Sequence, residues 1–517
     1  MVTATTTLAV TVVTLACFTG LGLWYVQRRG GVRTAEEFVS ARNSTGVGAT
    51  TATLVASVMG VWILLAPVEA GAAFGGVSAV LGYAVGEAIP MLAYARLGPR
   101  IRDLIPEGHT LTEYALARYG PAMYAFVLLV SVFYMFVFLA AELTGIASAF
   151  ELVAGVPRWQ TGVLVGGFVL LYTSYGGLPA SIFTDAVQTV LVLPLLLVSA
   201  VGAVAVLGGP TEVYGAVVAT EPSLVDPTFF TGLRFGVWVA VAILGAELVN
   251  QTWWQRVYAA RDVDTLKRGF RTAAITNFCV VLVAGLFGVA ARGVADVVVT
   301  GEGYNASIAF FVLLSEAFPD LLVLAVVLLA LLLVMSTADT LFNALASVVT
   351  ADLPRVLDEP DDRTLTWGAR LLTVVVAVAA ILVSLRAQSV LRLFLLADLF
   401  GAAVMTPLLY GLYSRRATGG GMLVASLSGL AVGLAFFQSP IVRGTLESLP
   451  LVGPRLPPAD FLWAFLGAAG VSALVAVVSA RLTDADFDLD RLSTAVRRFD
   501  DRAVDGGVEE RVDDPAD

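Results

Sequence analysis

The chain has 517 residues and a net charge of −10, and 58% of its residues are hydrophobic while only 14% are charged. A soluble protein carries about 25% charged residues, so this composition excludes an ordinary soluble domain, and we expect no nucleic-acid partner. Repeated apolar runs of about 20 residues predict an all-α polytopic membrane protein, because helices satisfy their own backbone in a lipid bilayer. The alternating ten-residue strands of a membrane barrel are missing from the sequence.

We predict about thirteen transmembrane helices, at residues 6–26, 49–70, 78–97, 122–147, 160–178, 183–207, 234–253, 271–293, 321–350, 367–386, 391–413, 421–437 and 462–481. The first could be a signal peptide, but Arg28 and Arg29 follow it and no Ala-x-Ala cleavage site is evident, so we expect it to be retained. Arginines gather in every second loop, which places those loops and the C-terminus in the cytoplasm and the N-terminus outside. We therefore expect a multi-pass protein of the cell (plasma) membrane.

These helices divide the chain into five parts. Residues 1–48 hold the first helix and a cytoplasmic loop, 49–207 and 208–417 hold five helices each, and 418–482 hold two more. The two sets of five predict an inverted repeat. Residues 483–517 contain twelve acidic residues against five arginines, so we expect an acidic, disordered cytoplasmic tail.

Each set of five opens with a helix interrupted by small or polar residues, at 56–60 in the first set and at 245–250 in the second. Interrupted helices in corresponding positions are the best sequence pointer to a transporter site. Polar or aromatic side chains in or near the helices are our candidate solute ligands: Ser57, Trp62, Glu69, Glu87, Glu142, Glu247 and Asn250. The carboxylates could instead be protonated and structural, and Trp62 could gate a pocket.

Asp185 and Gln188 follow a Gly-Gly-Leu-Pro break and lie one helical turn apart. Asp185 could cap a helix or lie at an ion site. Ser336 and Thr337 lie inside the ninth helix, where hydroxyl oxygens are hard ligands suited to a small monovalent cation. They could also simply bond to the carbonyl four residues earlier.

Three further segments lie at helix ends or in loops. We expect residues 99–121 to form a cytoplasmic loop with a short helix capped by Thr110 or Thr112, and residues 306–318 to form an external surface helix. Arg256 closes the seventh helix and fits a cytoplasmic positive anchor. The place of the Gln255-Arg256 pair directly after an interrupted helix also makes it a candidate for a functional role.

Four stretches, taken in order, resemble the sodium:solute symporter family. They are residues 35–46, the Gly-Gly-Leu run through Gln188, the Gln255-Arg256 segment through Asp262, and Ser336-Thr337-Ala338-Asp339 through Leu353. The resemblance implies a LeuT-type fold that couples Na⁺ as the transported ion to a small solute. It also implies a sodium site made by the carbonyls of Ala56, Met59 and the region of Leu333 and by the side chains of Ser336 and Thr337, with Asp185 nearby.

The resemblance leaves the solute open among urea, proline or a related amino compound, and a monocarboxylate. Gly245, Ala246 and Glu247 stand where sugar transporters of the family place aromatic gates, which disfavours a sugar. Residues 109–120 are similar to the urea-transporting branch. A membrane-embedded enzyme is a poor alternative with one histidine and two cysteines, and a membrane sensor would need a larger domain after the last helix.

Overall fold

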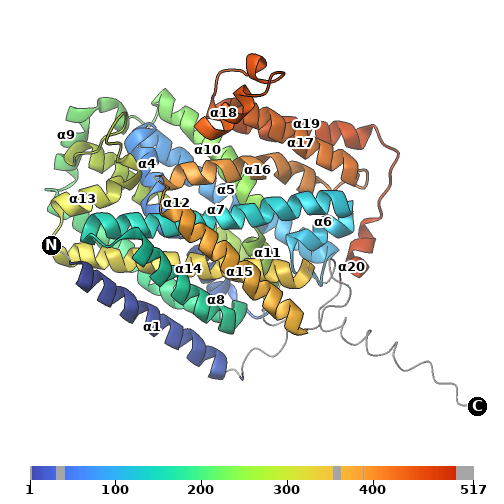
Figure 1. Cartoon of the computed structure of the whole chain (residues 1–517), viewed down its shortest axis with the longest axis horizontal. Coiled ribbons are helices and arrows are strands. Elements are labelled where there is room, and N and C mark those ends of the chain that lie inside the picture. Colours follow the sequence, from blue (N-terminus) through green and yellow to red (C-terminus); the bar gives the residue numbers. More distant parts are fainter. Residues whose placement is uncertain (1–2, 29, 31–40, 353–361, 388, 497–517) are drawn as a thin grey trace, which may run out of the picture.

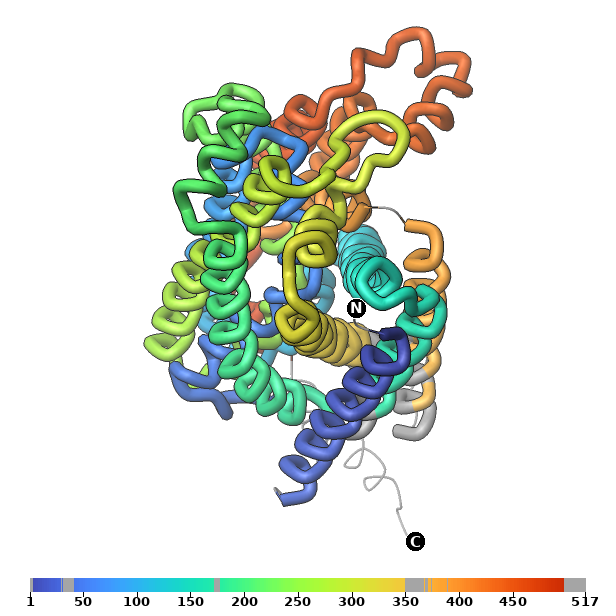
Figure 2. The backbone as a smooth tube through the Cα atoms, turned by 90° about the vertical axis from the view of Figure 1, so that its left-hand side faces the viewer, coloured from blue at the N-terminus to red at the C-terminus, as the bar shows by residue number. Residues whose placement is uncertain are grey.

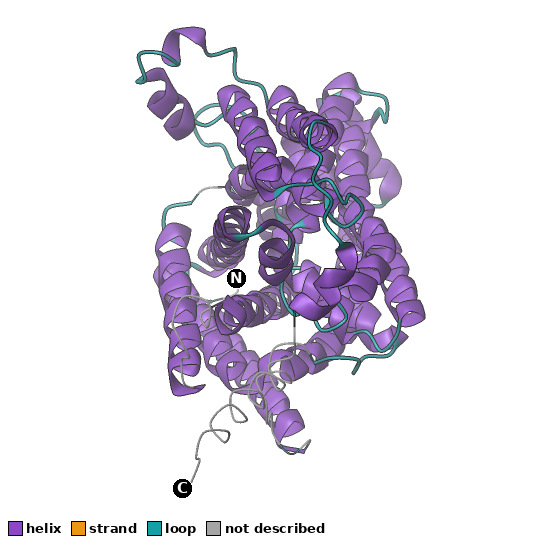
Figure 3. Cartoon of the chain, turned by 90° about the vertical axis from the view of Figure 1, so that its right-hand side faces the viewer, coloured by secondary structure: helices purple, strands orange, loops and turns teal. Residues whose placement is uncertain are grey.

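The computed structural model describes residues 3–28, 30, 41–352, 362–387 and 389–496. Figure 1 shows the labelled helices stacked side by side, and Figure 3 shows that the described part consists of helices and loops. The longer helices are α1 (Ala4–Arg28), α5 (Gly76–Leu104), α7 (Pro121–Ala154), α8 (Arg158–Val206), α10 (Phe230–Leu248), α12 (Val263–Val294), α14 (Asp320–Asp352), α15 (Asp362–Ser384), α16 (Val390–Tyr410), α17 (Gly419–Phe436) and α19 (Phe461–Arg481). The shorter ones are α3 (Val47–Val58), η1 (Val61–Leu64), α4 (Ala66–Ala73), α6 (Leu111–Tyr119), α9 (Pro210–Thr220), η2 (Pro222–Val225), α11 (Gln251–Ala259), η3 (Ala306–Ile308), α13 (Ala309–Ala317), α18 (Pro440–Glu447), η5 (Gly453–Arg455), η6 (Leu489–Arg491) and α20 (Leu492–Ala495).

In the described part of the chain, 10 helices are long and apolar enough to cross a membrane, and one bent pair raises the number to 11. All thirteen predicted spans coincide with helical segments, although the predicted spans at 160–178 and 183–207 both lie within α8. The two halves of α8 meet at Gly177, whose φ of 57° lies in the left-handed region that glycine adopts without a steric penalty. The expected count of thirteen therefore stays a prediction, whereas the break between these two spans lies where the Gly-Gly-Leu-Pro run indicated.

The first helix expected to be interrupted is broken between α3 and η1. The helix before the break and the segment after it are bent by 58° relative to each other. Val58 ends α3, and the backbone of Met59 and Gly60 leaves the helical conformation. A side chain on Gly60 would collide with the carboxylate of Glu142, so a larger residue here would displace that carboxylate of α7.

The second interrupted helix is broken between α10 and α11. Leu248 ends α10, and the side chain of Asn250 caps α11 by accepting a 2.9 Å hydrogen bond from the N–H of Thr252. The hydroxyl of Tyr94 on α5 donates to the carbonyl of Leu248, at 3.0 Å, and so satisfies one of the groups that the helix end leaves open. Both interruptions thus lie where the sequence predicted them.

The broken helices lie inside a bundle made by the longer ones. α5 packs against both α10 and α12, and α14 packs against α8 and α7. α1 lies along the outer side of the bundle against α8, as the dark blue helix in Figure 2 shows. α17 and α19 pack together on α16, on the opposite side of the molecule in Figure 1.

A short backbone pairing joins the two broken helices at one end. The segment that leads into α3 runs parallel to the end of α11, where Thr45 and Ala260 form an isolated β-bridge. The N–H of Thr45 donates to the carbonyl of Ala259, at 3.0 Å, and the N–H of Arg261 donates back to the carbonyl of Thr45, at 2.9 Å. A third bond runs from the N–H of Asn43 to the carbonyl of Tyr258, at 3.0 Å. We call this pairing the backbone clasp.

The structure confirms one expectation about the short helices in loops and contradicts the other. α6 begins after Thr110, whose side chain accepts from the N–H of Glu113 in a capping box, so the expected cap is confirmed. Residues 306–318 do form η3 and α13, but the expectation of a surface helix is wrong. Phe310 and Phe311 of α13 are buried, because this helix packs against α12, α7 and α4.

Part of the expected tail is also folded. Residues 483–496 include η6 and α20, and Leu489, Leu492 and the following Val496 are buried. The N–H of Phe487 donates to the carbonyl of Arg415, at 2.8 Å. The expectation of disorder over 483–496 is therefore wrong, because these few apolar residues find a surface on the bundle that composition alone does not reveal. Residues 497–517 lie outside the described part.

Candidate functional site

The carboxylate of Asp185 is the centre of a buried polar network between four helices. Its Oδ1 accepts a 2.6 Å hydrogen bond from the hydroxyl of Ser336 on α14, and its Oδ2 accepts a 2.7 Å bond from Thr53 on α3. The guanidinium of Arg256 on α11 lies 3.6 Å from Oδ2. All four side chains are buried. Asp185 therefore ties both broken helices to α8 and α14, and it is not merely a cap at the break in α8.

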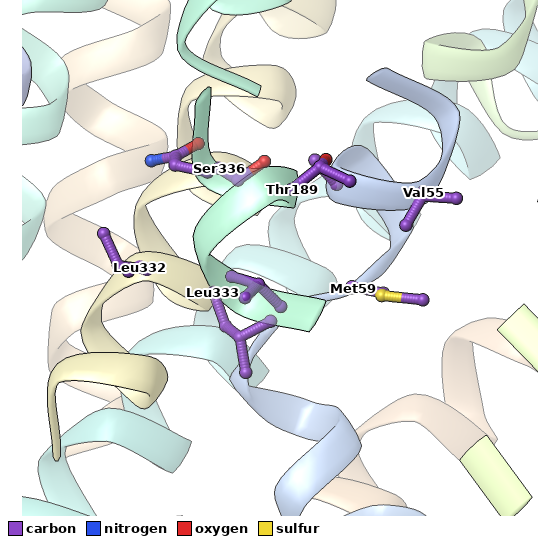
Figure 4. Close-up of a pocket in the computed structure, with 9 residues that line it drawn as sticks. Val55, Met59, Thr189, Leu332, Leu333 and Ser336 are labelled. Carbon is purple, nitrogen blue, oxygen red and sulfur yellow. The ribbon is translucent and has the colours of Figure 1, made fainter. Parts of the chain in front are cut away.

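A small cavity of about 10 Å³ lies beside this network. It is lined by Val55, Ala56, Met59, Gln188, Thr189, Val192, Leu332, Leu333 and Ser336. Figure 4 shows the labelled lining residues, which come from α3, α8 and α14 and, in Met59, from the break after α3. A volume of this size holds about one water-sized particle. Four of the residues that the family resemblance implies as sodium ligands, Ala56, Met59, Leu333 and Ser336, thus line one cavity.

The break in the first helix leaves a carbonyl facing this region without its usual helical partner. In an uninterrupted helix the N–H of Gly60 would bond to the carbonyl of Ala56. Here that N–H bonds instead to the carbonyl of Val58, at 2.9 Å. The carbonyl of Ala56 therefore lacks this helical hydrogen bond, and Ala56 is one of the residues that line the cavity.

Two polar side chains near the cavity have no hydrogen-bond partner within the described residues. Both amide atoms of Gln188 are buried and unbonded, and Gln188 lines the cavity. The hydroxyl of Thr337 is also buried and unbonded, but Thr337 is not a lining residue. Buried polar groups are normally satisfied, so these two need a ligand or water that the protein itself does not supply. The sequence drew attention to Gln188 without assigning it a role.

Arg256 is buried, which corrects the interpretation of this residue as a cytoplasmic anchor. Only 1% of its surface is exposed, since α11 packs against α3, α5 and α14. Its Nη2 donates to the hydroxyl of Thr340, at 2.9 Å. Asp339, whose carboxylate accepts from Ser181 at 2.8 Å, adds a second negative charge that acts on Arg256. Arg256 thus supplies the positive charge of the network.

The candidate solute ligands of the first broken helix have protein partners. Ser57 donates its hydroxyl to the carbonyl of Thr53, and the indole N–H of Trp62 donates to the carbonyl of Val58, at 2.8 Å. Glu142 accepts from the backbone N–H groups that open η1. A carboxylate at the start of a helical segment is favoured by the local dipole, so this contact holds the second half of the broken helix in place.

Glu69 lies apart from the other candidates, near the loop that precedes η3. Its Oε1 accepts from the hydroxyl of Tyr304, at 2.5 Å, and its Oε2 accepts from Ser389, at 2.9 Å. These contacts join α4 to Tyr304, which lies just before η3, and to Ser389, which caps α16. As for Glu142 and Ser57, a role in solute binding stays a prediction.

The remaining candidates gather around the second broken helix. Glu247 accepts from the hydroxyl of Tyr134, at 2.7 Å, and from the amide of Asn250, at 2.9 Å. Glu87 accepts a long bond of 3.5 Å from the amide of Asn277. The charges of Glu87 and Glu247 act on each other and on a third buried carboxylate, which is Asp398 of α16.

Asp398 and Tyr134 were not among the candidates from the sequence. Asp398 lies in an otherwise apolar stretch of the predicted span 391–413, with no break or hydroxyl motif beside it. An ionisable residue within a transmembrane segment is a functional candidate on its own, and that signal could have found Asp398. Tyr134 had no comparable signal, because tyrosines are common in membrane helices.

Comparisons with known proteins agree with this architecture. A family model described as "Sodium:solute symporter family" matches residues 38–429. The chain is 29% identical over 365 residues to the spermidine transporter DUR31 of Candida albicans, which covers 69% of this chain and 66% of that protein. It is 26% identical over 250 residues to the urea active transporter of Saccharomyces cerevisiae, covering 45% of this chain and 34% of that protein. The chain thus spans less than two thirds of the length of these relatives.

A bacterial relative and two solved structures extend the likeness. The osmoregulated proline transporter OpuE of Bacillus subtilis is 26% identical over 369 residues, covering 68% of this chain and 73% of that protein. A substrate-bound, outward-open Na⁺-coupled sialic acid symporter superposes with a TM-score of 0.73 at 17% identity, over 93% of this chain and 98% of that one. Mhp1, a nucleobase-cation-symport-1 family transporter, gives 0.58 at 14% identity, over 90% and 100%. These structures confirm the expected LeuT-type fold.

Proposed function

Because this chain belongs to the sodium:solute symporter family, we propose that it is a secondary active symporter that couples inward Na⁺ movement to uptake of a small polar organic solute. The family and the relatives are transporters, so an enzyme or a non-transporting sensor is not favoured. The relatives are named for spermidine, urea, proline and pantothenate, so we propose a solute of one of these classes. We further propose the plasma membrane as its location, with the N-terminus outside and the C-terminus in the cytoplasm.

The observation that carries the sodium proposal is the small cavity beside Asp185. Its volume of about 10 Å³ suits one small ion, and Ala56, Met59, Leu333 and Ser336, which carry candidate oxygen ligands, are among the residues that line it. The released carbonyl of Ala56, the hydroxyl of Ser336 and the unbonded amide oxygen of Gln188 would be ligands. The backbone of Met59 and Leu333 and the free hydroxyl of Thr337 complete the proposed set.

The charges around this cavity favour a monovalent cation. Asp185 accepts a hydrogen bond from the lining residue Ser336, and Arg256 already balances part of its charge. A divalent ion would need more negative charge than this shell offers. Sodium entering the cavity would compete with Ser336 and Arg256 for the same carboxylate, so we propose that ion binding rearranges the contacts between α3, α8 and α14. The membrane potential supplies about 2.3 kcal/mol per charge per 100 mV for inward movement.

The test measures sodium binding without requiring a known solute. Melting of the purified protein in detergent is followed in NaCl and in KCl at equal ionic strength. The wild type should be stabilised by Na⁺, and the Ser336→Ala/Thr337→Ala double variant should need at least about tenfold more Na⁺ for the same shift, since it loses two oxygen ligands. Ser426→Ala is the control, because this buried hydroxyl of α17 bonds only to the carbonyl of Met422. Equal Na⁺ dependence in the double variant and wild type would refute the site.

Uptake into liposomes tests the coupling itself. Labelled urea, proline, pantothenate and spermidine are each offered with an inward Na⁺ gradient and with a K⁺ gradient of equal size. Accumulation that requires the Na⁺ gradient supports symport. Accumulation that is equal in both gradients for every solute that enters would contradict coupling to Na⁺.

A further inference from the structure

We propose that Glu87, Glu247 and Asp398 together bind a solute carrying two or more amino groups, so that the transported compound is an organic di- or polycation. This inference rests on the proposed transport function and specifies the class of its solute. The three side chains come from α5, α10 and α16, and none of them contributes to the Asp185 network. We call them the carboxylate cluster.

Close helix packing brings the cluster together. A side chain on Gly245 of α10 would collide with the backbone of Ala402, and one on Gly401 of α16 would collide with the backbone of Ala246. Small residues at both points let the two helix backbones approach closely. Glu247 follows directly after this contact on α10, and Asp398 lies one turn before it on α16. α5 packs against α10, where a side chain on Gly86 would meet Ala240 and Ile243, so Glu87 follows directly after this helix contact.

The cluster has no positive partner within the described part of the chain. Glu87, Glu247 and Asp398 form no ion pair there with any arginine or lysine, and all three are buried. Asp398 is 6% exposed and has neither a hydrogen bond nor an ion pair in that part. Three ionised carboxylates that act on one another in a low dielectric are costly unless positive charge joins them. A cationic ligand supplies that charge.

A second, independent observation is an unsatisfied amide beside the cluster. Asn277 on α12 is completely buried, and its amide nitrogen points to Glu87. Its Oδ1 has no hydrogen-bond partner in the described residues. An acceptor left open next to carboxylates requires a donor, and an ammonium group provides up to three. A carboxylate-bearing solute would instead bring another acceptor to a site that already lacks donors.

Aromatic rings border the cluster on the side of the first broken helix. Trp62 packs against Tyr83 and Phe394, with ring centroids 6.2 and 6.1 Å apart. Tyr83 lies one helical turn before Glu87, and Phe394 lies one turn before Asp398. Aromatic faces attract ammonium groups and also cover the methylene segments between them. A flexible aliphatic amine matches this combination of carboxylates and rings, whereas urea has no positive charge to offer.

Each broken helix contributes residues to this region. Glu247 and Asn250 flank the point where α10 ends, and Trp62 follows directly after the break in the first helix. The C-terminal end of a helix carries partial negative charge, which favours a cation next to Glu247. The cluster is thus positioned where a solute would contact both halves of the repeat.

The experiment measures binding of labelled spermidine to the purified protein in the presence of Na⁺. We expect spermidine to bind at least about tenfold more tightly than n-butylamine, which carries one charge, and proline and urea to compete weakly. Asp398→Asn and Glu247→Gln should each weaken spermidine binding by about tenfold or more while keeping the side-chain shape. Glu212→Gln is the control, because it removes one charge from an exposed position on α9.

The outcomes distinguish a failure of this inference from a failure of the proposed sodium coupling. If Na⁺ stabilises the wild type but spermidine does not bind, or binds equally to the wild type and to both neutral variants, the carboxylate cluster is not the solute site and sodium coupling stands. If spermidine binds through the cluster but Na⁺ has no effect on stability or uptake, the inference holds and the sodium coupling fails. Neutral variants that melt normally and bind like the wild type would mean that the cluster carries protons and has a structural role.

Discussion

Removing one charge of the Asp185–Arg256 pair should leave the other charge buried without its partner and destabilise the protein. In Arg256→Met, Asp185 and Asp339 remain as buried carboxylates without their cation. In Asp185→Asn, the negative charge of Asp339 still acts on Arg256. This variant should therefore lose less stability than Arg256→Met. The double variant leaves neither Asp185 nor Arg256 charged, and its loss of stability should be smaller than the sum of the single losses.

The size of the effect follows from the geometry. The charged atoms lie 3.6 Å apart. At an effective dielectric constant of about 20, two unit charges at that separation attract each other by about 4 to 5 kcal/mol. Breaking a buried pair on one side typically costs about 3 to 5 kcal/mol. The hydrogen bonds that Ser336 and Thr53 donate to Asp185 survive in Arg256→Met and offset part of that loss, so we expect a coupling energy of about 2 to 4 kcal/mol.

Denaturant titration of the four proteins in detergent, followed by tryptophan fluorescence, gives the coupling energy. The matched control is the exposed pair of Asp264 and Arg268 on α12, whose charged atoms are 2.9 Å apart. Solvent screens that pair, so the same cycle there should show almost no coupling. Additive losses in the Asp185–Arg256 cycle would refute the reasoning, because they would mean that the two charges are balanced by other groups.

Three further outcomes are expected. Glu142→Gln should cost about 1 to 3 kcal/mol of stability, because one backbone N–H at the start of η1 loses its acceptor, and hydrogen exchange at that segment should rise. Gly245→Ala should cost about 1 to 3 kcal/mol in a melting assay by forcing α10 and α16 apart, whereas Gly470→Ala, which meets nothing within 4 Å, should not lower stability. A chain cut after Val496 should melt like the full protein. A chain cut after Leu482 should melt at a lower temperature, since three buried apolar side chains are lost. Equal melting temperatures of the two truncated chains would show that residues 483–496 add no stability.

The sequence predicted the helical architecture well because each apolar run is long enough to be read independently. The breaks at 56–60 and 245–250 were also visible, since small and polar residues rarely interrupt membrane helices without a purpose. Ser336 and Asp185 were each identified from the residues next to them in the sequence. Their 2.6 Å hydrogen bond joins residues 151 positions apart, and such a contact cannot be read from local pattern.

The errors share one physical origin, which is tertiary packing of segments that look exposed. Arg256 follows the end of an apolar run and matches a surface anchor, yet α11 turns back into the bundle and finds carboxylates there. Phe310 and Phe311 lie in a short segment between polar loops, but α12 covers them. Asp398 has no local companion in sequence, because its neighbours Glu87 and Glu247 are supplied by other helices.

The backbone clasp has a mechanical consequence for the transport cycle. Three main-chain hydrogen bonds fix the lead-in to α3 against the exit from α11, so these two points travel together whatever side chains surround them. Two segments that are joined at one end can change their relative tilt only at the other end. Tilting of the broken helices should therefore be concentrated at their unfastened ends, beyond Gly60 in one helix and before Val249 in the other, where the chain has already left its helical path.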